Sequence, residues 1–285
     1  MTDATRVAVL IDCDNISHRW ARAILGEAAK HGTLGIKRGY GDWTSDRLKN
    51  WRPELATYAV QPVQQFAYTI GKNSTDFALV IDAMDLLYSG TVDVFCIVSS
   101  DSDFTRLAMR LRESGKRVHG IGARKTPEAF QNACDRFTYV EVLVDAEDLE
   151  PEQSEAATAR TATKAAMTAA KATAKKATAK KTPTKKAAST KATASTRKRE
   201  LDKLTALFLP AVEANAKDDG WAPLSAVGSY VVNTNPTFDS RNYGYSKLSN
   251  LVRDLPRLEV QDIPVGNGLS VLHVRESGSK PRKRG

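Results

Sequence analysis

Buried-strand patterns alternate with helical patterns along the first half of the chain. Short runs of mostly β-branched or aromatic apolar residues, each ending in a polar or glycine-containing turn, predict strands buried on both faces of a parallel sheet. Six such runs lie at 6–11, 34–40, 59–63, 94–98, 117–122 and 139–143. Between them apolar residues recur at helical spacing, for example Phe104, Leu107 and Leu111. The alternation predicts a three-layer, Rossmann-like α/β domain with a parallel sheet over residues 1–150.

One helix of this domain has an apolar stripe that is expected to face the sheet. The helix is predicted over residues 76–89, and its Asp76 and Asp82 lie outside the apolar stripe. The stripe comprises Phe77, Val80, Ile81, Met84 and Leu87. Because side chains three or four positions apart share one side of a helix, the spacing predicts that the stripe packs into the core.

The composition changes completely at about residue 151. Alanine, threonine and lysine dominate residues 151–200, and no aromatic residue lies between Tyr139 and Phe208. Such a segment cannot bury enough apolar surface to offset the entropy that is lost on ordering. We therefore predict a disordered linker over 151–200.

Helical spacing returns at Leu201. Three helices and two alternating strands are expected over 201–212, 225–232, 246–252, 258–262 and 269–274. Three helices followed by a two-stranded wing are typical of a winged-helix module, which we place at residues 201–275. Residues 276–285 form a short basic tail.

The positive charge of the chain lies in its middle. The whole chain has a net charge of +9, whereas residues 151–200 carry +10 and residues 1–150 carry −3. Clustered lysines attract polyanions by releasing counterions, without reading base sequence. We expect the linker to contact RNA or DNA, with simple spacing between domains as the alternative.

Several classes of function have no motif in this sequence. There is no G-x-x-x-x-G-K-[ST] loop and no G-x-S-x-G elbow, and the four histidines do not fall at ligand spacing. The three cysteines form no C-x-x-C pair, so a zinc site is not expected. No apolar run approaches the length of a membrane span and no leader pattern follows Met1, which predicts a cytoplasmic protein without a membrane partner.

Aspartates stand at two strand ends and at one helix start. Asp12 and Asp14 end the first strand, Asp76 opens a helix, and Asp101 and Asp103 end the strand at 94–98. If the two strands are neighbours, the carboxylates converge at one edge of the sheet, where open α/β sheets bind ligands. Such a cluster favours Mg²⁺ or Mn²⁺, which can activate water and neutralise charge on a phosphodiester. The alternative for the last two aspartates is helix capping, which we expect through Ser102 or Asp103.

Three segments carry a resemblance to a known family. They read Val-Leu-Ile-Asp12-Cys-Asp14-Asn15, Lys72-Asn-Ser-Thr-Asp76-Phe-Ala-Leu-Val-Ile-Asp82-Ala and Val-Ser-Ser-Asp101-Ser-Asp103-Phe104. In this order they resemble the NYN family of the PIN-like ribonuclease fold, in its bacterial LabA-like branch, over about residues 5–145. The resemblance implies metal-dependent cleavage of RNA, with a catalytic set of Asp12, Asp76, Asp101, Asp103 and Asn15. The four acids would bind metal, Asn15 would orient the first acid or a phosphate, and Asp14 and Asp82 match less closely.

Basic residues near these motifs could hold an RNA backbone. They are Lys72, Arg106, Arg110, Arg124 and Lys125. Ordinary exposed helix charges are the alternative for each of them. Of these, we predict that Lys72, Arg106 and Arg124 bind nucleic acid.

The C-terminal module resembles the OST-HTH (LOTUS) domain. The resemblance rests on Gly220-Trp221-Ala-Pro-Leu-Ser-Ala-Val-Gly228 and Pro236-Thr-Phe238-Asp239-Ser-Arg241-Asn-Tyr243-Gly244-Tyr245-Ser-Lys247-Leu248. It implies a winged helix that binds RNA, or in some cases a partner protein. Aromatic and basic side chains suit stacking on unpaired bases. The candidates are Arg241, Tyr243, Tyr245 and Lys247, and a structural turn is the alternative for Tyr243 and Gly244.

The leading hypothesis is a metal-dependent endoribonuclease with a tethered RNA-binding module. A non-catalytic RNA-binding adaptor is a second hypothesis, although no acid of the set is missing. A haloacid-dehalogenase-like phosphatase is a third, because Asp12-Cys13-Asp14 matches its D-x-D pair and Lys116 would supply its later lysine. That hypothesis leaves the winged helix and the linker unexplained. The sequence does not decide whether the protein forms a homodimer.

Overall fold

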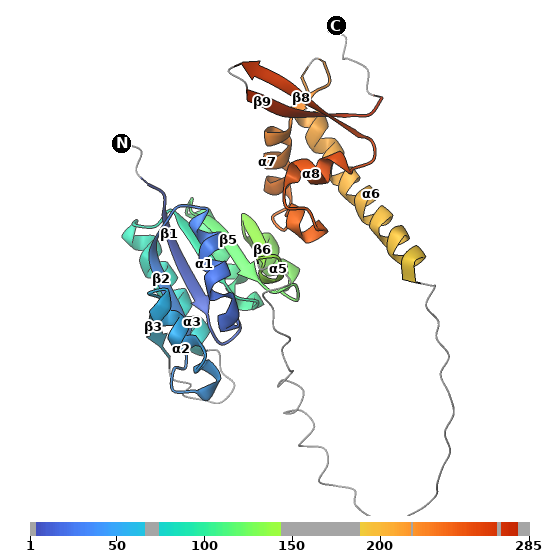
Figure 1. Cartoon of the computed structure of the whole chain (residues 1–285). Helices are drawn as coiled ribbons and strands as arrows, with labels where there is room; N and C mark the ends of the chain where they lie inside the picture. The colour runs from blue at the N-terminus through green and yellow to red at the C-terminus, as the bar shows by residue number, and fades with distance from the viewer. Residues whose placement is uncertain (1–3, 66–73, 144–188, 218, 267–268, 279–285) are drawn as a thin grey trace, which may run out of the picture. The chain divides into compact units, whose positions relative to one another are not determined.

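The computed structural model describes residues 4–65, 74–143, 189–217, 219–266 and 269–278 (Figure 1). They form an N-terminal domain, residues 4–143, and a C-terminal domain, residues 189–278, and each is described by itself. Most of the predicted linker lies outside the described residues, as do Lys72 and most of the basic tail.

The N-terminal domain is built on a six-stranded parallel sheet with the strand order β3-β2-β1-β4-β5-β6 (Figure 1). The strands are β1 Arg6–Asp12, β2 Thr33–Gly41, β3 Gln61–Gln64, β4 Val94–Val98, β5 Arg117–Gly122 and β6 Arg136–Tyr139. β1 and β4 are neighbours, with Ile11 opposite Val98, so the predicted adjacency of these strands is confirmed. The order of the strands reverses between β1 and β4, which is where such sheets open a crevice for ligands.

Helices cover both faces of this sheet. α1 (Ala21–Ala29) and α2 (Trp51–Thr57) pack on one face; α3 (Ser74–Ser89), α4 (Thr105–Glu113) and α5 (Glu128–Ala133) pack on the other. Val9 and Ile11 of β1 join the core under α1, whereas Leu10 joins the core under α3. Successive side chains of a strand point to opposite faces, so one apolar run supplies both layers. The predicted three-layer parallel α/β fold is confirmed.

The last strand and the stripe of α3 differ from the predictions. β6 ends at Tyr139, and residues 140–142 form the 3₁₀ turn η4 (Val140–Val142), in which Val140 is buried. A short apolar run does not distinguish a strand from a buried turn. On α3, Phe77 and Ile81 are 69% and 60% exposed, and the buried residues include Leu79 instead. This helix has apolar residues around most of its circumference. The spacing of those residues is therefore compatible with more than one choice of the face that packs on the sheet.

The C-terminal domain is a winged helix, as predicted. Its elements are α6 Ser189–Asn215, β7 Ala222–Pro223, α7 Leu224–Thr234, η7 Ser240–Tyr243, α8 Leu248–Arg253, β8 Leu258–Gly266 and β9 Leu269–Glu276. The strands form an antiparallel sheet, β7-β9-β8, and Phe208, Val227 and Leu251 meet in the core. The two-residue strand β7 was missed because it is too short to show alternation.

α6 begins within the predicted linker, before Leu201. Alanine, lysine and arginine are good helix formers, so a packed C-terminal half can extend the helix backwards. Neither α6 nor another helix of the described ranges is long and apolar enough to cross a membrane.

Candidate functional site

Asp12, at the end of β1, is the most buried acid of the predicted site. It is 1% exposed, and its Oδ2 accepts hydrogen bonds from Asn15 Nδ2 at 2.6 Å and from Ser99 Oγ at 2.7 Å. Burial raises the pKa of this carboxyl although both bonds lower it. Its Oδ1 is buried without a hydrogen-bond partner among the described residues. A buried carboxylate oxygen without a partner is costly, so this atom is suited to a ligand.

Asp101 is fixed by the turn that follows β4. Its backbone N–H donates to Ser99 Oγ at 3.1 Å, and its Oδ1 accepts from the N–H of Asp103 at 3.0 Å. Asp101 is therefore the N-cap of the 3₁₀ helix η3, Ser102–Phe104. The expectation that Ser102 or Asp103 provides the cap was wrong, because the extended residue before the turn is Asp101. Capping uses one carboxylate oxygen, so it is compatible with metal binding through the other.

Asp12, Asp76, Asp101 and Asp103 form what we call the acidic cluster. One carboxylate oxygen from each of Asp76, Asp101 and Asp103 lies within 4.8 Å of the others. Burial, followed by the negative charges of Asp12, Asp101, Asp103 and Asp14, raises the pKa of Asp76 to about 7. Because Ser99, at the end of β4, donates to Asp12 Oδ2, β1 contributes to the same site as β4, to which α3 adds Asp76.

The donor set of the acidic cluster fits a hard divalent cation. Each member offers carboxylate oxygens, which Mg²⁺ and Mn²⁺ prefer over nitrogen and sulfur. The orphaned Oδ1 of Asp12 and the raised pKa of Asp76 are two signs of uncompensated negative charge. A cation would relieve both, and protonation is the alternative in its absence.

Family comparisons agree with this geometry. A family model of the NYN domain matches residues 6–150, and one of the OST-HTH/LOTUS domain matches residues 194–270. The chain belongs to the NYN-domain family. Its NYN domain belongs to a PIN-like nuclease superfamily, and its OST-HTH/LOTUS domain is of a type that binds RNA. The predicted domain architecture is confirmed.

Among known proteins, this NYN-domain chain is similar to an uncharacterized protein of Methanocaldococcus jannaschii. The two are 27% identical over 158 residues, which cover 52% of this chain and 61% of that relative. The chain thus spans about three fifths of the length of the curated relative it matches.

Two solved structures are each similar to part of the NYN-domain chain. A protein of unknown function from Vibrio parahaemolyticus is 16% identical, with a TM-score of 0.42, and the match covers 52% of this chain and 97% of that one. A protein from Chromobacterium violaceum, solved in solution, is 41% identical, with a TM-score of 0.23, and the match covers 27% of this chain and 82% of that one.

The less closely matched acids of the NYN domain have different surroundings. Asp82 accepts a hydrogen bond from Tyr40 Oη at 2.8 Å and pairs with Arg38 Nη1 at 2.9 Å. It therefore joins α3 to β2, outside the acidic cluster. Asp14 lies in the loop after β1, 3.8 Å from Arg47 Nη2, beside a polar pocket that Asn15 also lines.

The basic candidates of the NYN domain are exposed. Arg106 lies on the outer side of α4. The Arg124 guanidinium lies 5.3 Å from the centre of the Tyr139 ring, and its backbone N–H donates to Glu141. Lys72 lies outside the described residues. Lys116, which the phosphatase hypothesis requires, precedes β5 and so lies at the amino end of the sheet, opposite the end that carries Asp12.

The candidates of the OST-HTH domain fall into two groups. Within this domain Arg241 Nη2 is 2.6 Å from Asp239 Oδ2, and Tyr245 Oη donates to Asp254 Oδ2 at 2.7 Å. These two side chains thus have structural partners. Tyr243 is 39% exposed and stacks on Phe238 with the ring centres 6.1 Å apart, while Lys247 is exposed at the start of α8.

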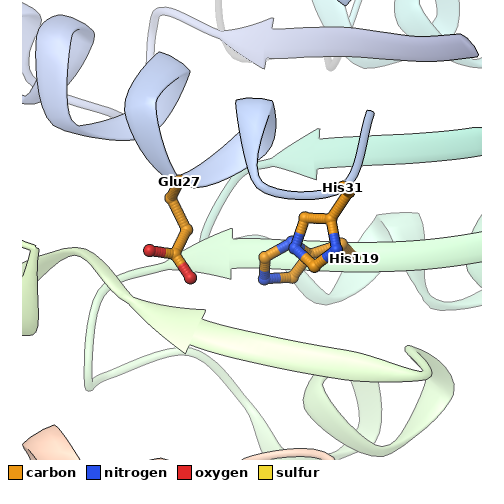
Figure 2. A group of neighbouring side chains, drawn as sticks. All are labelled: Glu27, His31 and His119. Atoms are coloured by element: carbon orange, nitrogen blue, oxygen red, sulfur yellow. The ribbon is translucent and has the colours of Figure 1, made fainter. Parts of the chain in front are cut away.

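A second group of metal-ligating residue types was not predicted from the sequence. Glu27 and His31, at the end of α1, and His119, on β5, each offer an atom within 4.8 Å of the others (Figure 2). The two imidazole rings meet edge to face, 4.3 Å apart, and His119 Nε2 lies 2.9 Å from Thr138 Oγ1. His119 is far from Glu27 and His31 in sequence, so no spacing signal could have joined the three.

The charges around this histidine pair oppose a divalent cation. Lys30 Nζ already binds Glu27 Oε2 at 2.6 Å. Burial, followed by the positive charge of Arg136, lowers the pKa of His31, and burial lowers that of His119. His31 Nε2 and His119 Nδ1 have no hydrogen-bond partner in the part of the chain that the structure describes. Because nearby cations would repel a metal ion, we assign the pair to packing of α1 on the sheet.

Proposed function

We propose that this NYN-domain protein is a metal-dependent endoribonuclease that hydrolyses phosphodiester bonds of RNA. The observation that carries the proposal is the close approach of Asp76, Asp101 and Asp103 in an NYN domain whose Asp12, bonded to Ser99 at the end of β4, has one buried oxygen without a partner among the described residues. Cytoplasmic location, membership of the LabA-like branch and any dimer stay predictions.

The residues of the acidic cluster have distinct tasks in this proposal. Asp76, Asp101 and Asp103 would hold Mg²⁺ or Mn²⁺ together with Asp12. When bound, the ion would neutralise charge on the phosphodiester and lower the pKa of a water molecule. Asn15 and Ser99 each donate to Asp12 Oδ2, so Oδ1 is the oxygen of Asp12 that would be available to the ion.

The reaction is hydrolysis at phosphorus. The water oxygen forms a bond to phosphorus and gives up a proton to solvent, while the bond to one ribose oxygen breaks and the leaving oxygen takes up a proton from solvent. No oxidant or further co-reactant is needed. The acids supply no covalent intermediate, which is consistent with an Asp12 that is 1% exposed and already holds two hydrogen bonds.

The second domain and the linker would supply RNA to the NYN domain. Tyr243 and Lys247 present an aromatic ring and an ammonium group at the surface of the OST-HTH domain, as stacking on unpaired bases requires. The net charge of +10 on residues 151–200 adds attraction to any nucleic acid, DNA included. A protein partner of the OST-HTH domain is compatible with the same surface.

One set of incubations tests the class of function. The full chain is incubated with Mn²⁺ and, separately, with end-labelled single-stranded RNA, single-stranded DNA and a small phosphate monoester. Internal cleavage of RNA supports the endoribonuclease. Tight binding of RNA without cleavage would overturn it in favour of an adaptor, and release of phosphate from the monoester would overturn it in favour of a phosphatase.

A further inference from the structure

A groove lies beside the edge strand β3, between that strand and α2. Its volume is about 570 Å³, and it is lined mainly by apolar groups with Trp43 as its aromatic wall. The lining also includes Arg52, Leu55, Ala56, Pro62 and Gln64. We propose that this Trp43 groove binds one unpaired nucleobase of the RNA strand that the acidic cluster cuts, an inference that rests on the proposed function.

Hydrogen bonds fix the indole nitrogen and the backbone of Trp43. Its Nε1 donates to the carbonyl of Val63 at 3.0 Å, and its backbone N–H donates to Gln64 Oε1 at 3.0 Å. Arg52 Nη2 donates to the carbonyl oxygen of Trp43 at 2.8 Å. A ring that is fixed before binding loses little conformational freedom when a base stacks on it, so more of the stacking energy is available for affinity.

Trp43 brings one wall of the groove to the carboxyl edge of the sheet, the edge that carries the acidic cluster. Trp43 follows the carboxyl end of β2, and its ring lies over Gly39, where an added Cβ would be 3.6 Å from Trp43 Cζ2 and 3.0 Å from Cys13 Sγ. Cys13 stands between two acids of the site, and Gly39 is opposite Ile11 of β1. β3 is two strands from β1, which corresponds to roughly 10 Å. An RNA strand that leaves the acidic cluster in the direction of β2 and β3 would therefore run toward the groove.

The chemistry of the groove suits a base on a charged backbone. The face of an indole ring stacks on any of the bases, and the apolar wall of Leu55 and Pro62 excludes water from the second face. Arg52, a lining residue, is exposed, and the Arg47 side chain, 79% exposed, lies 3.8 Å from Asp14 Oδ1. Both guanidinium groups can pair with phosphates. Bases in a duplex are not available for such insertion, so the groove favours single-stranded RNA.

A strand-forming protein partner fits this edge less well. Edge strands pair with other chains through their free N–H and C=O groups. β3 has only four residues, and Pro62 within it has no N–H to donate. The groove therefore recognises a planar ring better than an added strand.

The test measures binding of a short fluorescent single-stranded RNA to the full chain, in an Asp101→Asn background that prevents cleavage. Trp43→Leu is expected to weaken binding by roughly 5- to 100-fold, and Trp43→Phe much less, because phenylalanine keeps an aromatic face. Tyr88→Leu, which removes another exposed aromatic ring of the same domain, is the matched control. An RNA with an abasic residue at the position of the inserted base should bind the Trp43→Leu variant and its parent alike.

A second variant leaves Trp43 and its hydrogen bonds intact. Ala56 is exposed on the α2 wall, and Ala56→Glu places a negative charge in the groove. It should weaken RNA binding as well, whereas Ala29→Glu, on an exposed site of α1, should not.

Two outcomes would overturn the groove proposal. If both groove variants bind RNA as tightly as their parent and the wild-type protein cleaves RNA, the groove proposal is refuted and the proposed nuclease activity is not. Unchanged affinity together with a loss of self-association in sedimentation would identify the groove as a contact between copies of the chain. Weaker binding in the variants, in a protein that never cleaves RNA, would instead refute the nuclease and keep the groove as a binding site.

Discussion

Replacing Asp76 by asparagine should stabilise the metal-free protein. The pKa of Asp76 is raised to about 7 by burial and by neighbouring carboxylates, compared with an ordinary value of 3.8. The folded state therefore holds the proton more tightly than the unfolded state does. The contribution of the bound proton to the free energy of unfolding is fully present below pH 3.8 and is lost as the pH rises through about 7. Asparagine carries no charge at any of these pH values, so the variant does not lose stability in this way.

The magnitude follows from the pKa and the exposure of the side chain. A pKa of about 7 in place of 3.8 corresponds to roughly 4 kcal/mol as an upper limit. Because about half of this group is open to solvent, screening reduces the effect to roughly 1–2 kcal/mol. For a domain of this size, that is an increase in the melting temperature of roughly 3–8 °C.

Thermal melts of wild type and Asp76→Asn, in the presence of a chelator, measure the effect at pH 8 and pH 5. The variant should melt higher at pH 8, and its advantage should fall to roughly a third at pH 5. Asp82→Asn, the same change on the same helix, removes the negative charge that pairs with Arg38 and accepts from Tyr40, and should destabilise at both pH values. An advantage of Asp76→Asn that is absent at pH 8, or equal at the two pH values, would refute the electrostatic account of the acidic cluster.

Three further predictions concern the support of the site, the sheet and the linker. Ser99→Ala removes the donor at 2.7 Å from Asp12 Oδ2 and should cost about 1–3 kcal/mol in a denaturant melt; no change would show that this bond does not support the site. Gly120→Ala places a Cβ 2.5 Å from Phe137 Cδ2 and should cost about 1–3 kcal/mol, whereas Gly35→Ala meets nothing within 4 Å and should be nearly neutral; equal melts would contradict the packing of β5. Deleting residues 156–188, which spares α6, should weaken RNA binding and flatten its dependence on salt, and an unchanged slope would show that those lysines do not touch RNA.

The sequence predicts the layers of the fold well because parallel strands leave a strong local signal. β4 is five consecutive apolar residues, all of them buried, and its bounds are those expected from the pattern. The signal fails where burial depends on tertiary packing. Phe77 and Ile81 have the spacing of core residues and yet are exposed, because α3 has apolar residues on more than one side.

The candidate site is predictable in its position and less so in its details. The adjacency of β1 and β4 brings Asp12 and Asp101 to one edge, as the strand ends suggested. Which residue caps η3 depends on backbone angles, which the sequence Ser-Ser-Asp-Ser-Asp leaves open. The contact of His31 with His119 depends on how α1 packs on β5, and no local pattern reports it.

The central claim is that the acidic cluster uses a divalent cation to cut RNA. Its most direct test is single-turnover cleavage of one labelled single-stranded RNA at increasing Mn²⁺, by wild type, Asp101→Asn and the control Asp82→Asn. The account predicts that wild type and Asp82→Asn cleave only when the ion is added, and that Asp101→Asn is slower by roughly 100-fold or more. Cleavage by Asp101→Asn at the wild-type rate, or cleavage by the wild type in a chelator, would contradict it.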